Sequence, residues 1–363
     1  MTLGTETHSE LAELTPVELG LATRNHGLPL EAMRYDVTPL GLHYLLIHFD
    51  IPEVDVGSWT LTIDGHVGRP ISLGLDELRE RPRVTRACTL ECAGNGRARV
   101  LPRAISQPWL EEAVGNAEWT GTPLAPLLEE AQVEEGAVEV LFRGLDRGIQ
   151  GGIEHSYERS LPLDEALRPE LLLAYEINGQ PLPPQHGFPL RLIVPGWYGM
   201  THVKWLDRIT LLTEPFEGYQ QTQQYRRKQS EEDPGVPVTR MLPRSLLIPP
   251  GIPDFPGRQR FLQPGDCLLE GRAWSGWGPI ARVEISVDGG STWEDAELGE
   301  AVGDFGWVAW AFRWEDARPG EYELCSRATD AAGNVQPVEP EWNYAGYVNN
   351  AVQRVPVTVR EES

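Results

Sequence analysis

The abundance of glycine and proline is the feature that most restricts how this chain can fold. The 363 residues include 37 glycines and 31 prolines. Proline lacks the amide hydrogen that a helix interior needs, and glycine loses much conformational entropy when it is fixed in a helix. Long helices are therefore disfavoured, and we expect short strands and a few short helices joined by turns.

Apolar segments in the first two thirds of the chain predict a mixed domain. Residues 84–90 are strand-like and 171–177 look like a buried strand, whereas 124–131 has the apolar spacing of a short helix. Residues 218–236 differ, because they are rich in glutamine and charge and end in Asp233-Pro234-Gly235. Few stable contacts are expected to cross such a segment, so it predicts a domain boundary.

Beyond residue 265 the pattern is that of an all-β domain. Polar and apolar residues alternate in segments 267–274, 281–287, 308–314 and 321–329. Asp288-Gly289-Gly290 is a strong hairpin turn. Short strands separated by frequent turns are typical of an immunoglobulin-like β-sandwich. We therefore predict an α+β chain, with a mixed α/β domain over residues 15–230 followed by an immunoglobulin-like sandwich over residues 236–363.

The strong negative charge limits the partners that the chain can bind. Its formal net charge is −23, which argues against nucleic acid and anionic membranes, because both attract basic surfaces. A small anion remains possible at a local basic pocket. No apolar run is long enough to cross a membrane, and Met1-Thr2-Leu3-Gly4 begins no recognisable leader. We expect a cytoplasmic protein, or a periplasmic one only if a leader has been removed.

The four cysteines do not form the dense pattern of a disulfide scaffold. Cys267 and Cys325 could face each other across the sandwich or remain two unpaired thiols. Cys92 lies in a glycine-containing loop after the 84–90 strand, among seven arginines between Arg79 and Arg103. Positive charge favours the thiolate that a metal needs. On its residues alone, Cys92 is either a metal ligand or a buried structural cysteine.

Three further clusters combine histidine with a cation. They are Arg24-Asn25-His26, the segment from His186 to Arg191, and His202-Val203-Lys204. If the last one is a strand, His202 and Lys204 point to the same side. Such groups suit a phosphate or another polyanion. The alternative is that each cluster contains hydrogen-bonded core histidines beside surface charges.

Taken in order, these motifs are similar to those of the sulfite oxidase family. The resemblance extends from Arg24-Asn25-His26 to Trp342-Asn343. The motifs between them are Leu90-Glu91-Cys92-Ala93-Gly94-Asn95, Leu173-Ala174-Tyr175-Glu176-Ile177-Asn178-Gly179-Gln180-Pro181-Leu182-Pro183, His186-Gly187-Phe188-Pro189-Leu190-Arg191, His202-Val203-Lys204-Trp205-Leu206, Ala273-Trp274-Ser275-Gly276, Asp288-Gly289-Gly290-Ser291-Thr292-Trp293 and Asn334-Val335-Gln336-Pro337. Each motif is moderately specific, whereas the ordered set is highly specific.

The resemblance implies a sulfite-oxidase-type molybdopterin domain that holds a molybdenum–molybdopterin cofactor. Cys92 matches the family's thiolate ligand to the metal, and Cys88 matches no ligand. The positions that hold the pterin and its phosphate fall on Arg24, Asn25, His26, Asp146, His186, Arg191, His202 and Lys204. This agrees with the polyanion site indicated by the cations.

The resemblance also implies an oxyanion pocket. Arg24 and Arg97 match two of its arginines, and Trp109 matches its tryptophan. Tyr225 matches its tyrosine, although Gln223-Gln224 stands where the family usually has Arg-Asp. A third arginine is expected shortly after Trp342-Asn343, but the residue there is Ala345. The substrate is therefore less well defined than the cofactor.

The implied reaction is oxidation of sulfite to sulfate by oxo transfer. The chain contains no recognisable haem or flavin domain, so electrons are expected to pass to a separate acceptor such as a c-type cytochrome. The sandwich resembles the family's dimerisation domain, which implies a homodimer. Ala345 supports an alternative in which the same cofactor reduces nitrate or a sulfoxide. A third possibility, a non-catalytic β-sandwich binding protein, conflicts with Cys92 and the set of pterin contacts.

Overall fold

Helices are short in the part of the chain that this computed structural model describes, residues 8–10 and 13–361. The longest α-helix there is α1 (Pro16–Ala22), which has seven residues. The others are α2 (Leu75–Arg79), α3 (Ala125–Glu130), α4 (Leu163–Ala166) and α5 (Tyr219–Thr222). The expectation of few and short helices is confirmed. No helix within these ranges is long and apolar enough to cross a membrane.

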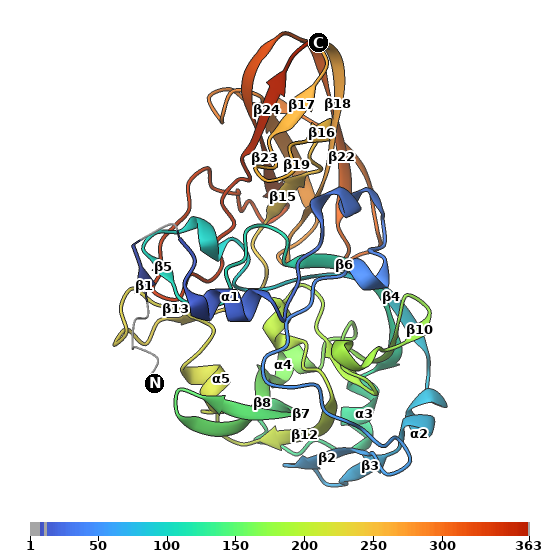
Figure 1. The fold of residues 1–363 in the computed structure, drawn as a ribbon. Coiled ribbons are helices and arrows are strands. Elements are labelled where there is room, and N and C mark those ends of the chain that lie inside the picture. The colour runs from blue at the N-terminus through green and yellow to red at the C-terminus, as the bar shows by residue number, and fades with distance from the viewer. Residues whose placement is uncertain (1–7, 11–12, 362–363) are drawn as a thin grey trace.

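Two five-stranded sheets form the first half of the molecule, which lies at the lower end of the view in Figure 1. One sheet has the order β10-β9-β6-β4 with β11 on β9, and the other has the order β3-β2-β12-β7-β8. The strands of the first are β4 (Val84–Glu91), β6 (Val114–Pro123), β9 (Leu172–Ile177), β10 (Gln180–Pro181) and β11 (Arg191–Ile193). Those of the second are β2 (Leu61–Gly65), β3 (Ile71–Leu73), β7 (Glu139–Gln150), β8 (Ile153–Pro162) and β12 (Leu206–Leu212).

Strand β9 shows how the apolar runs build this core. Leu173 packs into the larger apolar cluster, which also contains residues of β2 and β7, whereas Leu172 and Ala174 pack into a second cluster around Cys92. Successive side chains of a strand point to opposite faces, so a strand that is buried on both faces must be apolar throughout. The continuous run at 171–177 is the sequence signature of that position.

The second half is a sandwich of a four-stranded and a six-stranded sheet, with orders β15-β18-β22-β21 and β16-β17-β24-β23-β19-β20. The first contains β15 (Arg244–Leu247), β18 (Gly265–Trp274), β21 (Glu297–Ala301) and β22 (Val308–Ala317). The second contains β16 (Ile252–Pro253), β17 (Arg260–Leu262), β19 (Ile280–Ser286), β20 (Glu294–Asp295), β23 (Gly320–Asp330) and β24 (Val355–Val359). Leu269, Trp310 and Val357 belong to the apolar core between them. The predicted α+β class with a C-terminal sandwich is confirmed.

Small pairs of strands complete the fold. Strand β1 (His8–Ser9) pairs with β5 (Arg103–Ala104), and β13 (Arg226–Arg227) pairs with β14 (Val236–Pro237). The β13–β14 hairpin encloses the second part of the segment 218–236. The division at residues 230 and 236 itself stays a prediction.

The two halves contact each other through buried backbone as well as side chains. The amide of Thr89 in β4 donates to Phe305 O at 2.9 Å, and the indole of Trp307 donates to Asp36 O at 2.9 Å. Gly276 lies so close to the first half that an added Cβ would be 1.9 Å from Gly196 O. The sandwich is therefore packed tightly onto the first domain at the end where β4 leads into the Cys92 loop.

The condition attached to His202 and Lys204, that they lie in a strand, is not met. A short 3₁₀-helix (Gly199–Thr201) precedes His202, and β12 begins only at Leu206, so residues 202–205 are not a strand. His202 and Lys204 nevertheless line the same cavity, because the irregular backbone between these elements turns both side chains inward.

Candidate active site

Cys92 follows β4 directly and lies in a loop whose conformation is fixed by hydrogen bonds. Its amide donates to Ala113 O at 2.9 Å, and the amide of Asn95 donates to Cys92 O at 2.9 Å. The amide of Gly94 donates to the Cys92 sulfur at 3.4 Å. The thiol is 8% exposed. The loop therefore presents a nearly buried sulfur with one backbone donor already directed at it.

The arginines around Cys92 do not act together on the thiol as the sequence predicts. Burial raises the pKa of Cys92, and the Gly94 amide, Arg97 and Trp109 oppose that rise. Most of the other arginines bind carboxylates instead, in the pairs Arg79–Asp76, Arg81–Glu130, Arg83–Glu176, Arg99–Glu111 and Arg103–Glu18. Arg97 is the one among them whose charge reaches the sulfur. A bound metal ion, which deprotonates a coordinating thiol, would have to supply the remaining stabilisation.

The other cysteines are free thiols, and none forms a disulfide. Cys88 lies in β4 with no exposed surface, and burial raises its pKa to about 12. Cys267 in β18 and Cys325 in β23 belong to different sheets of the sandwich. The thiols are left unpaired, which was one of the two possibilities for Cys267 and Cys325.

Cys92 lines two cavities that share one wall. We call the first the inner cavity. Among the predicted site residues it is lined by Cys92, Asp146, His186, Arg191, His202, Lys204 and Tyr225. We call the second the outer cavity, which has a volume of about 630 Å³ and is lined by Arg24, Cys92, Arg97, Trp109 and Tyr225. The structure thus brings the predicted residues together in two adjoining groups, with Cys92 and Tyr225 between them.

The inner cavity contains two cations, and no carboxylate of the described residues lies within ion-pair distance of either. Arg191 is 5% exposed, donates to His186 O at 3.0 Å, and lies 4.6 Å from the centre of the Trp119 ring. Burial lowers the pKa of Arg191 to about 10, so the guanidinium stays charged. Lys204 donates to Leu46 O at 2.9 Å, and burial lowers its pKa while the charge of Asp146 opposes the change. Both cations are available to an anionic group.

The histidines of the inner cavity differ in what they can still bind. His202 accepts from the Val194 amide at its Nδ1, so its Nε2 carries the proton and donates to Trp197 O at 3.1 Å. Both ring nitrogens of His202 are therefore used by the backbone. The ring nitrogens of His186 bond to none of the described residues, and burial lowers the pKa of His186 to about 2, so the ring is neutral.

His43 also lines the inner cavity and has no signal in the sequence motifs. Its Nδ1 lies 3.0 Å from Tyr44 O, a carbonyl that can only accept, so the ring proton is at Nδ1. Its Nε2 is then a buried acceptor without a partner among the described residues. The Nε of Arg191 is likewise a buried, unpartnered donor. An inner cavity with unpartnered ring nitrogens, aromatic walls and two cations fits a heteroaromatic group with a phosphate, as a molybdopterin has.

The outer cavity is suited to an anion. Arg97 is 5% exposed, and its Nε donates to Ala345 O at 3.0 Å. Its guanidinium lies 4.9 Å from the centre of the Tyr347 ring. Neither Arg24 nor Arg97 has a carboxylate within ion-pair distance among the described residues, so both charges can act on a ligand. Trp109 is 5% exposed, and its indole nitrogen has no aligned acceptor within the same ranges.

Tyr225 has a left-handed backbone conformation, with φ of 53°, which is uncommon for a residue other than glycine. Its ring lies 5.2 Å from that of Tyr347 and 5.4 Å from the guanidinium of Arg159. Arg159 is 3% exposed and donates to Gln220 O, and burial lowers its pKa. Tyr347 and Gln224 line the outer cavity and Arg159 contacts the Tyr225 ring, although sequence reasoning selected none of the three.

Asn25 and His26 line neither cavity. The side chain of Asn25 donates to Leu21 O at 3.0 Å and to Gln107 Oε1 at 2.8 Å, and it accepts from the Ile47 amide at 2.8 Å. His26 is exposed and pairs through its backbone with Leu45. Both residues fix the segment that leads to the inner cavity. Their direct contact with a cofactor stays a prediction.

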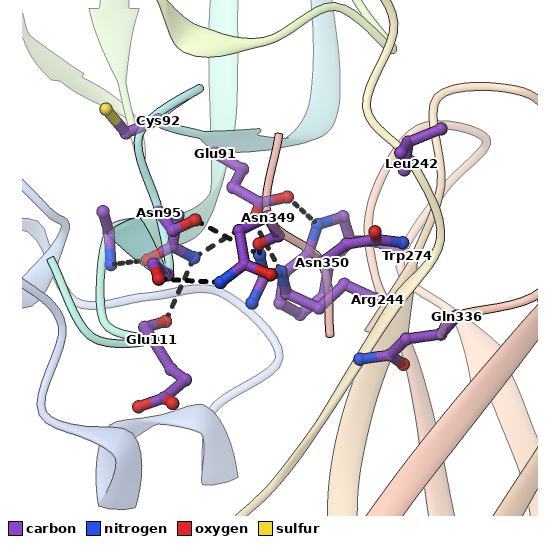
Figure 2. A network of polar contacts seen from close by, with 12 residues as sticks. Glu91, Cys92, Asn95, Glu111, Leu242, Arg244, Trp274, Gln336, Asn349 and Asn350 are labelled. Carbon is purple, nitrogen blue, oxygen red and sulfur yellow. Dashed lines mark hydrogen bonds and ion pairs between the residues drawn. The ribbon is translucent and has the colours of Figure 1, made fainter. Parts of the chain in front are cut away.

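The far side of the Cys92 loop is bound by the second domain. Figure 2 shows Cys92 pointing away from a polar network that joins Glu91, Asn95, Arg244, Trp274 and Asn349. In addition, the Val348 amide donates to Ala93 O at 2.7 Å. The loop is therefore built by both halves of the molecule.

Comparison with known protein families identifies both halves. Residues 48–220 match the model for the oxidoreductase molybdopterin binding domain, and residues 256–360 match the model for the Mo-co oxidoreductase dimerisation domain. The chain is 36% identical to mitochondrial sulfite oxidase of Rattus norvegicus, covering 89% of this chain and 62% of that protein. It is 33% identical to sulfite oxidase of Arabidopsis thaliana, covering 88% and 87%.

A solved structure is similar over nearly the whole chain. It is the sulfane dehydrogenase SoxCD from Paracoccus pantotrophus, with a TM-score of 0.80 and 27% identity over 98% of this chain and 90% of that one. The similarity in fold therefore includes both domains and the way they are joined.

Proposed function

The chain belongs to the sulfite oxidase family of molybdopterin-dependent oxidoreductases, and from this premise we propose that it oxidises sulfite to sulfate in the outer cavity. The observation that carries the proposal is that Cys92 lines both cavities. A thiolate ligand there would hold the metal at the junction of a site for the pterin and a site for an anion. When bound, the molybdenum cofactor supplies two-electron oxo transfer.

We assign the residues of the inner cavity to cofactor binding. Arg191 and Lys204 would bind the phosphate, because Arg191 is buried, Lys204 is half-buried, and neither forms an ion pair with a carboxylate of the described residues. His186 and His43 would bind the pterin through ring nitrogens that no described residue uses. His202 would support the wall of the cavity without binding the cofactor through its ring nitrogens, since both already bond to the backbone.

We assign the residues of the outer cavity to the substrate. Arg24 and Arg97 would attract and bind the oxyanion by charge-assisted hydrogen bonds, which is required in a protein whose net charge is −23. Trp109 would contribute its unpartnered indole N–H. Tyr225 would orient the substrate or a water molecule through its hydroxyl. The electrons released by oxidation of the substrate would pass to a separate acceptor such as a c-type cytochrome. The dimerisation domain would form a homodimer.

A second candidate keeps the cofactor and changes the substrate. Ala345 leaves the outer cavity without the third arginine that the resemblance implies, and Tyr347 lies beside Arg97 in this wall. A similar fold occurs in a protein named as a sulfane dehydrogenase. Another sulfur compound, nitrate or a sulfoxide would then be the substrate. The family match argues against the non-catalytic binding protein.

The decisive experiment combines molybdenum and pterin analysis with turnover. Purified protein is expected to contain both components and to reduce an artificial electron acceptor when sulfite is added. Nitrate, thiosulfate and dimethyl sulfoxide are compared under the same conditions. A protein that contains the cofactor but does not use sulfite would favour the second candidate, and a protein that cannot bind the cofactor would refute both.

A further inference from the structure

The residue before Cys92 forms a buried ion pair with the second domain. Glu91 ends β4, and its Oε1 lies 2.7 Å from Nε of Arg244, which begins β15. The two side chains are 1% and 2% exposed. The contact joins the strand that leads into the loop with the first strand of the sandwich, so it crosses the domain interface.

The surroundings of Glu91 are arranged for this carboxylate. Oε1 also accepts from Asn95 Nδ2 at 3.0 Å, and Oε2 accepts from Trp274 Nε1 at 2.9 Å (Figure 2). Arg244 in turn donates to Asn349 O and, at 3.5 Å, to Asn95 O. The carboxylate is thus bound by donors from both domains, and the guanidinium binds the loop and the chain near residue 349.

Stability alone does not explain a pair in this position. Moving two charges out of water costs several kcal/mol for each ion, and a well-packed apolar pair of the same size is often equally stable. A buried polar network instead favours a single geometry. Here both oxygens of Glu91 accept hydrogen bonds, and Nε of Arg244 lies within ion-pair distance of Glu91 without a hydrogen-bond partner of its own among the described residues. The geometry restricted here is that of the loop 91–96, because Asn95 also donates to Glu111 O at 3.2 Å and accepts from the Ala113 amide at 3.1 Å.

The side chains at positions 91 and 92 point in opposite directions (Figure 2). Fixing Glu91 from the sandwich side therefore fixes the direction in which the next side chain leaves the backbone. We propose that Glu91 and Arg244 are positioning residues that orient the Cys92 sulfur towards the metal of the cofactor. The proposal rests on the assignment of Cys92 as the metal ligand made above.

A double-mutant cycle on the holoenzyme tests the proposal. The variants are Glu91→Gln, Arg244→Gln and the combination of both, which replaces the ion pair by a neutral pair that can still hydrogen bond. The readouts are cofactor content, melting temperature, the visible absorption band of the thiolate–molybdenum bond, and the electron paramagnetic resonance spectrum of the partly reduced metal. The two spectra report the orientation of the sulfur and do not depend on turnover.

Each single variant is expected to shift both spectra, because it leaves one buried charge without its partner and allows the loop to rotate. The double variant is expected to return the spectra towards those of the parent protein. Spectra of folded single variants that equal those of the parent would overturn the proposal. A double variant as impaired as the worse single variant, in spectra or in folding, would overturn it as well.

Arg103→Gln is the matched control. Arg103 and Glu18 form an ion pair of the same length, 2.7 Å, with side chains 1% and 0% exposed. Glu18 belongs to α1, so this pair holds α1 in place and does not contact the Cys92 loop. This variant is expected to lower the melting temperature without changing the spectra. If it shifts them as much as Arg244→Gln does, the shift reflects general loosening and the proposal fails.

Failure of the underlying assignment gives a different result. If Cys92→Ala binds molybdenum and keeps the parent spectra, Cys92 is not the ligand, whatever the cycle shows. If Cys92→Ala loses the thiolate band and the cycle shows no coupling, the ligand assignment holds and only the positioning role is refuted.

Discussion

Arg97 is the residue at which anion binding can be separated from cofactor binding. It lines the outer cavity but not the inner one. Arg97→Gln removes a charge-assisted hydrogen bond of about 1.5–3 kcal/mol, so KM for the anionic substrate should rise about 10- to 100-fold at unchanged molybdenum content. Steady-state kinetics and metal analysis measure the two effects.

Arg99→Gln is the control for this prediction. Arg99 lies two residues further on, is bound to Glu111 at 2.8 Å, and lines neither the inner nor the outer cavity. Its replacement should leave KM within about twofold of the parent value, because the guanidinium binds Glu111 and faces neither cavity. An equal rise in both variants would mean that net charge, and not contact with the anion, determines KM.

Cys92→Ala should abolish turnover and leave the fold intact, because the thiol supplies the protein's ligand to the metal while the hydrogen bonds that close the loop are made mainly by backbone groups. Circular dichroism and thermal denaturation measure the fold, and dye reduction measures turnover. Cys88→Ala is the control, since Cys88 lines neither the inner nor the outer cavity. Substantial turnover by Cys92→Ala would refute the ligand assignment.

Tyr347 contributes a ring and a hydroxyl whose effects can be separated. The ring lies under the guanidinium of Arg97, and the hydroxyl donates to Gln224 Oε1 at 3.1 Å. Tyr347→Phe keeps the ring and should change KM less than threefold, whereas Tyr347→Leu loses a cation–π contact of about 0.5–2 kcal/mol and should raise KM further. Equal effects in the two variants would show that the hydroxyl is the functional group.

At the scale of elements, Gly276 tests how closely the domains are packed. A Cβ there would be 1.9 Å from Gly196 O and 2.7 Å from the Met241 amide nitrogen, and backbone atoms cannot turn aside as a side chain can. Gly276→Ala should therefore destabilise the protein by about 1–3 kcal/mol, measured by chemical denaturation. Gly41→Ala, where nothing lies within 4 Å of the added atom, should be nearly neutral.

The sequence predicted the strands of the sandwich but not strand β6. The strands of the sandwich could be predicted because they are buried mainly on one face and alternate at period two. Strand β6 was missed, since it contains polar residues that are buried. Asn116 accepts from Thr89 at 3.1 Å, and the hydroxyls of Thr120 and Thr85 lie 2.7 Å apart. These partners come from β4, so no local pattern could indicate that the polar groups are satisfied.

Some residues of the candidate site could be predicted from the sequence, and others could not. Cys92, His186 and Arg191 could be found because each belongs to a compact motif. His43 and Tyr347 reach the cavities only through contacts between segments far apart in the sequence, which leave no local signal. The arginines near Cys92 were misjudged for a related reason. Glu111, Glu130 and Glu176 neutralise three of them, and only the fold shows these pairings.

At the scale of the whole molecule, buried histidines make stability depend on pH. Burial lowers the pKa of His43 to about 4, of His186 to about 2 and of His202 to about 3. In the unfolded chain a histidine takes up a proton near pH 6.5, so below that pH the unfolded state binds more protons than the folded state. The free energy of unfolding is therefore largest above pH 6.5 and falls as the pH decreases towards 4.

Protein prepared without the cofactor should thus lose up to about 2 kcal/mol of stability at pH 5 for each histidine that stays neutral. Denaturation curves between pH 7.5 and 5 measure the slope. His43→Gln should flatten it, while replacement of the exposed His26 by glutamine should not. A slope that is the same in all three proteins would show that His43 does not stay neutral in the folded state.

The two-domain construction of the Cys92 loop has a consequence for how the protein matures. The Gly96 carbonyl accepts from Asn349 Nδ2 at 2.7 Å, across 253 residues of sequence, and Ala93 is bound by Val348. When only the first domain has been synthesised, Val348 and Asn349, which complete the hydrogen bonds of this loop, have not yet been translated. We therefore expect the loop to reach its final geometry only after the sandwich has been translated and has docked onto the first domain.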